Sequence, residues 1–183
     1  MIPAVAQTLA CLLAKGTSLG STEQISFSHP GNQSSVRPLL SLYLYSIQEN
    51  HRMQQRSLPS SSSPLSAASP TPVASSDTTR WYDMAFLVTA WDHTALGEQR
   101  LLSEALHLLL QYSCLPEEAL VTQLRGQVML PLQVSTRCVS EEAVLWHALR
   151  VPLRPAFSIT VTVPFHSPSD AIASDYSTMA TTP

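Results

Sequence analysis

The stretch from Leu87 to Tyr112 changes its hydrophobic period within a few residues. It reads LVTAWDHTALGEQRLLSEALHLLLQY, with alternating residues at its start and apolar residues three and four apart after Ala95. Alternation is typical of a half-buried strand, and the longer spacing is typical of an amphipathic helix. A helix that follows a strand so directly buries its apolar stripe by packing on the sheet. The sequence therefore predicts an α/β protein.

Five segments have the composition and alternation of strands. Two of them alternate clearly on one face, with Met84, Phe86, Val88 and Ala90 in one, and Phe157, Ile159, Val161 and Val163 in the other. Another sets Leu40, Leu42 and Leu44 against Tyr43 and Tyr45, so we expect both of its faces to be covered in part. The five segments are residues 23–31, 37–50, 80–92, 126–136 and 154–165.

Four helices are predicted between these strands. The first begins with Pro3 in its first turn and ends near Gly16 as its C-cap. The second, Ala95 to Tyr112, has an expected buried stripe of Leu102, Ala105, Leu106 and Leu109, and pairs Arg100 with Glu104 four residues on. The other two are Pro116 to Leu124, and a helix capped by Ser140 that continues through Arg150.

The order of these elements predicts the type of sheet. Consecutive strands near each end of the chain favour a mixed, mostly antiparallel sheet flanked by helices, that is, an α+β type of α/β fold. The segment from Ser57 to Thr79 is almost entirely Ser, Pro, Ala and Thr, which bury too little apolar area to order themselves. We expect one domain over residues 1–166 with this loop inserted at about 57–79, followed by a flexible tail over 167–183.

Composition excludes several classes of function. Charged residues make up 13% of the 183 residues, about half the usual share, and the net charge is −3 with no basic run, so nothing predicts nucleic-acid binding. The three cysteines, Cys11, Cys114 and Cys138, are too few and too far apart for a disulfide framework or a zinc site. We expect them to be buried small hydrophobes in a reducing compartment.

Targeting signals are also missing from the sequence pattern. No apolar run reaches the length of about 18 residues that a membrane span needs. The N-terminal apolar stretch lacks the basic residues that open a signal peptide, since its charge, Lys15, comes after it. We therefore expect the protein to be made in the cytoplasm and to lack a membrane span.

Asp92, His93 and Glu98 are the candidate catalytic residues, because an acid, an imidazole and a carboxylate follow the end of a strand. Helix capping is the better interpretation. Asp92 or Thr94 would accept from the free N–H groups of the next helix, and Glu98 would favour its positive end. The sequence has no nucleophile elbow, phosphate loop or paired histidines, so we predict no catalytic, cofactor-binding or metal-binding residue and no enzyme activity.

Three passages together resemble a known family. They are MIPAVAQTLACLLAKG, PLLSLYLYSIQEN and, above all, FLVTAWDHTALGEQRLLSEALHLLLQY, and VPLRPAFSITVTVP fits the family's closing strand. They resemble the tail-terminator (cap) proteins of phage-tail-like contractile injection systems. The resemblance covers most of residues 2–164 apart from the Ser/Pro-rich segment, and it rests on spread-out patterns, with no catalytic fingerprint.

This resemblance implies a structural role. It implies a hexameric ring at the tail end distal to the baseplate, which ends polymerisation of the inner tube and contacts the last sheath ring. The partners would be further copies of the chain, the inner-tube protein and the sheath protein. The protein would be made in the bacterial cytoplasm and become part of a particle that is cytosolic, membrane-anchored or released. We expect the strand broken by Pro131 and the closing strand Ala156–Phe165 to form sheet edges near interfaces.

Two other hypotheses stay open from the sequence. One is a small cytoplasmic α/β module, monomeric or dimeric, that binds a partner or a ligand without catalysis. The other, which the capping interpretation disfavours, is a hydrolase-like activity at Asp92 and His93.

Overall fold

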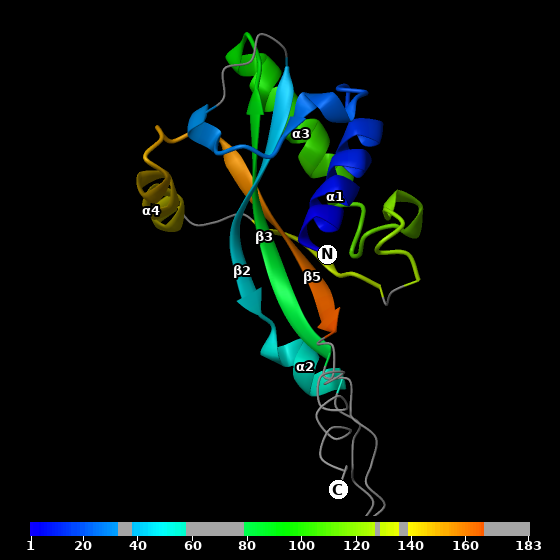
Figure 1. Cartoon of the computed structure of the whole chain (residues 1–183). Helices are drawn as coiled ribbons and strands as arrows, with labels where there is room; N and C mark the ends of the chain where they lie inside the picture. The colour runs from blue at the N-terminus through cyan, green and yellow to red at the C-terminus, as the bar shows by residue number, and fades with distance from the viewer. Residues whose placement is uncertain (33–37, 58–78, 127–128, 136–138, 167–183) are drawn as a thin grey trace, which may run out of the picture. The chain divides into compact units, whose positions relative to one another are not determined.

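The computed structural model describes residues 1–32, 38–57, 79–126, 129–135 and 139–166 (Figure 1). Its helices are α1 (Ile2–Gly16), α2 (His51–Ser57), α3 (Ala95–Leu109) and α4 (Val139–Leu149). Its strands are β1 (Ile25–Ser26), β2 (Leu39–Glu49), β3 (Thr79–Trp91), β4 (Leu132–Ser135) and β5 (Ala156–His166). The predicted fold class is confirmed, whereas the interior of the Ser/Pro-rich insertion and the C-terminal tail lie outside the described residues.

The five strands form one sheet in the order β1-β2-β3-β5-β4. Strand β1 runs parallel to β2, pairing Ile25 with Leu40, and β4 runs antiparallel to β5. The arrows of Figure 1 show β3 running opposite to its neighbours β2 and β5, so the sheet is mostly antiparallel as predicted. The prediction that β4, the strand after Pro131, lies at an edge is confirmed.

The prediction that the closing strand is also an edge is wrong. Strand β5 lies between β3 and β4, because strand order is set by backbone pairing with segments that are distant in the sequence. Strand β4 is short, however, and pairs only with Ser158–Val161 of β5. Beyond that pairing, the Thr162 N–H donates to the Pro131 carbonyl at 3.0 Å.

The residues divide into two compact units, one of Met1–Gln48 and Asp83–Val163, and one of Glu49–Tyr82 and Pro164–Pro183. The first unit contains α1, α3, α4 and most of the sheet. The second contains α2, where the Asn50 N–H donates to the Trp81 carbonyl at 2.7 Å. Also in the second unit, Tyr82 and Phe165 meet edge to face, with their ring centroids 5.3 Å apart and their planes at 79°.

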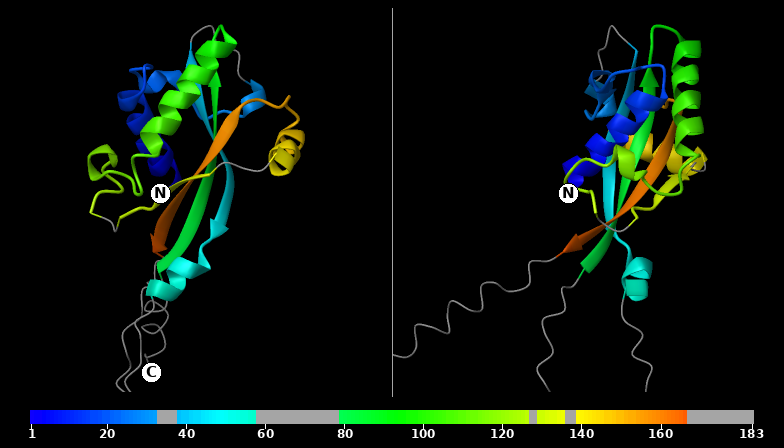
Figure 2. Two further views of the ribbon diagram at one scale, coloured as in Figure 1. Left: turned by 180° about the vertical axis from the view of Figure 1, so that it is seen from behind. Right: turned by 90° about the vertical axis from the view of Figure 1, so that its right-hand side faces the viewer.

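The core of the first unit lies between the sheet and two helices. Figure 2 shows α1 and α3 side by side on one face of the sheet, and α1 contacts α3. Most of the strand residues expected on this face are fully or almost fully buried: Leu40, Leu42, Met84, Phe86, Val88, Ala90, Phe157, Ile159, Val161 and Val163. Leu44, which was expected on the same face, is only half-buried. Alternation in the sequence therefore predicted the inner face of the sheet correctly.

The buried stripe of α3 differs from the prediction by a small rotation of the helix. Leu101, Ala105 and Leu109 are buried, while Leu102 and Leu106 are half-buried. Leucines occur on several sides of this helix, so its sequence is compatible with more than one buried stripe. Contact with α1 decides which of these residues are buried. The helix also ends at Leu109, three residues before the predicted end.

Helix α1 has the predicted start but not the predicted cap. Pro3 lies in the first turn, whereas Gly16 is the last helical residue and the C-cap is Thr17 in an extended conformation. Gly16 serves a different purpose, since a Cβ there would overlap the Leu108 side chain of α3. Glycine thus allows the close approach of the two helices.

Other local predictions failed for identifiable reasons. Helix α2 was not predicted, because His51–Ser57 has no apolar stripe. The helix predicted over 116–124 is a single 3-10 turn, Glu117–Ala119. Helix α4 begins at Val139, so Ser140 lies inside it and is not its cap.

Two cysteines were expected to be buried and are not. Cys11 and Cys114 are free thiols and half-exposed, because Cys11 lies on the flank of α1 and Cys114 in the turn after α3. Cys138 lies outside the described residues.

Candidate functional site

The junction between β3 and α3 is built around a helix cap. Thr94 is the N-cap of α3, and its hydroxyl accepts a hydrogen bond from the Gly97 N–H at 3.0 Å. This satisfies one of the free N–H groups at the start of the helix. Of the two capping residues that the sequence offered, Asp92 and Thr94, the structure uses Thr94.

Asp92 is packed onto the same turn, and His93 is not. A Cβ on Gly97 would overlap the Asp92 carboxylate, so a glycine is required for the carboxylate to lie there. His93 is exposed. The structure therefore does not bring Asp92, His93 and Glu98 together as a catalytic group.

Glu98 has a partner that the sequence did not suggest. Its carboxylate accepts from the guanidinium of Arg154, which lies 56 residues further along the chain. The same guanidinium stacks on the ring of Trp91, with its carbon 3.6 Å from the ring centroid. Both charged side chains are about one-fifth exposed, 22% and 21%, so the pair is partly shielded from water. This cluster joins the end of β3, the first turn of α3 and the segment before β5.

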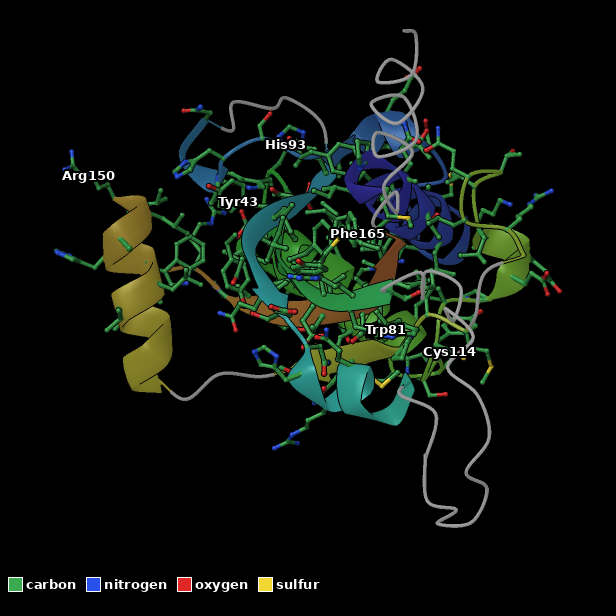
Figure 3. The ribbon with its side chains drawn as sticks, turned by 60° about the horizontal axis from the view of Figure 1, so that its bottom comes forward. Tyr43, Trp81, His93, Cys114, Arg150 and Phe165 are labelled. Carbon is green, nitrogen blue, oxygen red and sulfur yellow. The ribbon has the colours of Figure 1, made fainter. Side chains whose placement is uncertain are left out.

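The described residues provide little further chemistry. Within them no three His, Cys, Asp or Glu side chains gather as metal ligands would. Figure 3 shows His93 and Cys114 well separated, so they do not form a thiol–imidazole pair. None of the helices in this part of the chain has the length and apolar character of a membrane span.

The second face of the sheet carries polar side chains among its apolar ones. The Tyr45 hydroxyl donates to Ser158 Oγ at 3.4 Å, and the Thr162 hydroxyl donates to the Asp83 carboxylate at 2.6 Å. Tyr45 and Asp83 are half-buried. The expectation that both faces of β2 are covered in part is confirmed, with the tyrosine side more open than the leucine side.

Apolar side chains are exposed in several places of the first unit, among them the following two. One is a hollow of about 320 Å³ between the start of α1 and β2, lined mainly by Ile2, Ala6, Phe27, Leu42 and Leu44. We call it the α1–β2 hollow; no charged residue lines it, and Phe27 is 46% exposed. The other is the outer side of α4 and the segment after it, where Val144 is 72% and Leu153 60% exposed.

Comparison with known families identifies the chain. A family model described as the Pvc16 N-terminal domain matches residues 4–174. The chain belongs to this family. No curated protein matches the sequence.

Two solved structures share the fold of this Pvc16 N-terminal domain. One is the sheath/tube terminator of PVC, an extracellular contractile injection system, in its extended state, with a TM-score of 0.60 and 18% identity over 91% of this chain. The other is the tube-terminating cap of the anti-feeding prophage, with a TM-score of 0.53 and 18% identity over 91% of this chain. The match spans 57% and 54% of those two chains, so this chain spans about half of their length.

The family predicted from the sequence is thereby confirmed. The structural roles predicted for individual residues are confirmed only in part. Capping at the β3–α3 junction was foreseen because Thr and Asp before an apolar period are strong local signals. Arg154 was missed, because nothing local links it to Trp91 or Glu98. The α1–β2 hollow was missed for the same reason, since its residues come from three separate segments.

Proposed function

We propose that this chain is a structural tail terminator of a contractile injection system, and that it has no catalytic role. It would form a homohexameric ring that ends polymerisation of the inner tube and contacts the last sheath ring. The observation that supports this most strongly is the family match over residues 4–174, together with a shared fold with two terminator caps. The protein would be made in the bacterial cytoplasm and become part of the particle.

The mechanism follows from the geometry of helical stacks. A tube grows because each ring offers the next one the same docking surface, and growth continues until something occupies it. A terminator binds that end with one side and offers no equivalent surface on its other side. This requires rigid surfaces and no reacting groups, in agreement with a β3–α3 junction whose polar groups serve as a cap and an ion pair.

We further propose that residues 1–166 act as one domain in this role, with the Ser/Pro-rich segment as an insertion. The two compact units share three strands, since β2, β3 and β5 each have residues in both.

The test is growth of the inner tube from the purified, cognate tube protein. Added in small amounts, the full chain should shorten the tubes seen by electron microscopy, because each ring blocks one growing end. A chain that leaves tube lengths unchanged, remains monomeric and binds neither tube nor sheath would instead support the small binding module.

A further inference from the structure

Two hydroxyl groups of the sheet are buried without a protein partner. Ser41 of β2 is 0% exposed and Thr89 of β3 is 1% exposed. Among the residues that the structure describes, no group makes a hydrogen bond with either hydroxyl oxygen. Buried hydroxyls in folded proteins are nearly always paired, because an unpaired one loses the hydrogen bonds that water makes to it in the unfolded chain. These two groups therefore call for a partner.

Both hydroxyls lie on the second face of the sheet, away from α1 and α3. The residues on either side of Ser41 and of Thr89 belong to the buried inner face, and successive strand residues point to opposite faces. Elsewhere on the second face a hydroxyl finds a partner within the protein, as the Thr162 hydroxyl does in the Asp83 carboxylate at 2.6 Å. Ser41 and Thr89 differ from it in having none among the described residues.

Ser41 and Thr89 lie across from one another on neighbouring strands. Strands β2 and β3 are adjacent and run in opposite directions (Figure 1), and the Asn50 N–H donates to the Trp81 carbonyl. Nine residues back along β2 and nine forward along β3 bring Ser41 level with residue 90. The β3 residues nearest to Ser41 on its own face are therefore Thr89 and Trp91. Such neighbours have Cβ atoms about 5 Å apart when directly opposite and about 7–8 Å apart on the diagonal.

Trp91 adds a third polar atom in the same position. Its indole Nε1 is buried and donates to no group in the described part of the chain. The guanidinium of Arg154 lies over the face of the ring, 3.6 Å from its centroid, but a guanidinium carries only donors and cannot accept from the indole N–H. Three polar atoms without a protein partner thus come from one small region between β2 and β3.

The chemistry of these atoms determines what can bind there. The two hydroxyls donate and accept, whereas the indole N–H only donates. A hard cation would require carboxylate oxygens, which none of the three residues has. An anion would require a free positive charge, whereas the charge of Arg154 is paired with Glu98. The ligand must be small and neutral and must both donate and accept, which describes a water molecule.

We propose that a buried water site lies between β2 and β3, where water bridges the hydroxyls of Ser41 and Thr89 and accepts from the indole N–H of Trp91. Two oxygens that share one water, each about 2.8 Å from it, lie up to about 5.6 Å apart, which fits side chains on opposite strands. The water would join two strands at the end of the sheet that carries Trp91 and Arg154. This site is independent of the terminator function.

A crystal structure of the full chain tests the site directly. At a resolution that shows ordered water, a water oxygen should lie within about 3.2 Å of both Ser41 Oγ and Thr89 Oγ1. Hydroxyls that bond to each other or to backbone carbonyls, with no water between the strands, would overturn the proposal.

Substitutions test it in solution through the sign of the effect. Ser41→Ala and Thr89→Val each remove one hydroxyl and leave the other, with its water, short of a partner. Each should lower the equilibrium constant for folding, measured by urea unfolding, by about fivefold. The double variant removes both groups that hold the water and leaves no buried hydroxyl unpaired. It should lose no more than the weaker of the two single variants.

Hydroxyls that are buried without water predict the opposite sign, because removing an unpaired hydroxyl also removes the cost of burying it. A single variant more stable than the unchanged chain, or two losses that add in the double variant, would refute the site. Thr160→Val is the matched control, since Thr160 is half-buried on the same face and lines an open polar hollow. It should change the folding constant by less than about twofold. An equal loss there would mean that valine itself is unfavourable on this face, and would remove the support for the water.

Discussion

Helices α1 and α4 are both rich in apolar residues but differ in how the fold uses them. In α1, eight residues are buried, including Val5, Leu9 and Leu13 at 0% exposure. In α4, Trp146 is buried, while Val144 is 72% exposed. Both helices lie in the first compact unit, so the comparison stays within one part of the molecule.

The difference shows which apolar residues the fold covers and which it leaves exposed. The apolar residues of α1 form a stripe on one side, which the sheet and α3 cover. Those of α4 lie on both sides, so a single sheet cannot cover them all. A chain in which 13% of residues are charged has fewer charges to surround such a surface, which favours contact with another protein.

The largest effect should come from removing packing in α1. Leu13→Ala leaves a cavity against the sheet, because the side chain is fully buried, and should lower the free energy of unfolding by about 3 kcal/mol. Urea unfolding followed by circular dichroism measures this. A loss below about 1 kcal/mol would contradict the burial of α1.

One substitution made in both helices sharpens the comparison. Val5→Ala should lower the free energy of unfolding by about 2 kcal/mol, since it deletes two buried methyl groups. Val144→Ala should change it by less than about 0.5 kcal/mol, because the side chain is exposed and alanine favours helix. The same urea measurement applies to both, and equal losses would mean that α4 is as well packed as α1.

The segment after α4 is joined to α3 through Arg154. Arg154→Ala should lower the free energy of unfolding by about 1 kcal/mol, because the guanidinium both stacks on Trp91 and pairs with Glu98. Arg100→Ala is the control, since its pair with Glu104 is formed by a side chain that is 76% exposed and should contribute less than about 0.5 kcal/mol. Similar losses of free energy of unfolding for the two variants would show that the stacked pair stabilises the fold no more than the exposed pair does.

The end of α1 is joined to α3 by a carboxylate, and this contact should respond to pH. Hydrogen bonds from the Ser18 hydroxyl and the Ser18 N–H, the latter at 2.9 Å, lower the pKa of Glu104 below its ordinary value of 4.5, with a smaller contribution from Arg100. Because the pKa of Glu104 is lower in the folded state than in the unfolded state, the ionised carboxylate stabilises the fold at pH values above about 4.5. This stabilisation is lost as the pH falls through the pKa of the folded state.

The Glu104→Gln variant should therefore lose less stability than the unchanged chain when the pH falls below 4.5. The difference should be small, because the side chain is partly exposed. Thermal unfolding between pH 6 and about 3 would show this, with Glu117→Gln as the control for simple loss of an exposed charge. An unchanged pH profile in Glu104→Gln would mean that the Ser18 contact does not form in solution.

Local patterns made much of this fold predictable. Alternation identified the buried faces of β2, β3 and β5, because successive strand residues point to opposite faces whatever the rest of the fold does. The cap at Thr94 was likewise foreseeable from residues adjacent in sequence. The position of β5 within the sheet was not, since strand order depends on contacts between distant segments.

Features formed by distant segments escaped prediction for the same reason. Arg154 and Glu98 are 56 residues apart, and the hollow combines α1, β2 and Phe27. The outer side of α4 is a different case, because its apolar residues are visible in the sequence. Only the structure shows that the fold leaves them uncovered.

The central claim is that this chain caps one end of an injection particle. The most direct measurement is electron microscopy of cognate sheath–tube particles assembled with a gold-labelled full chain. The account predicts label at one end of each particle, opposite the baseplate, with no label along the sides. Label distributed along the sheath or tube, or particles that continue to lengthen past the label, would contradict it.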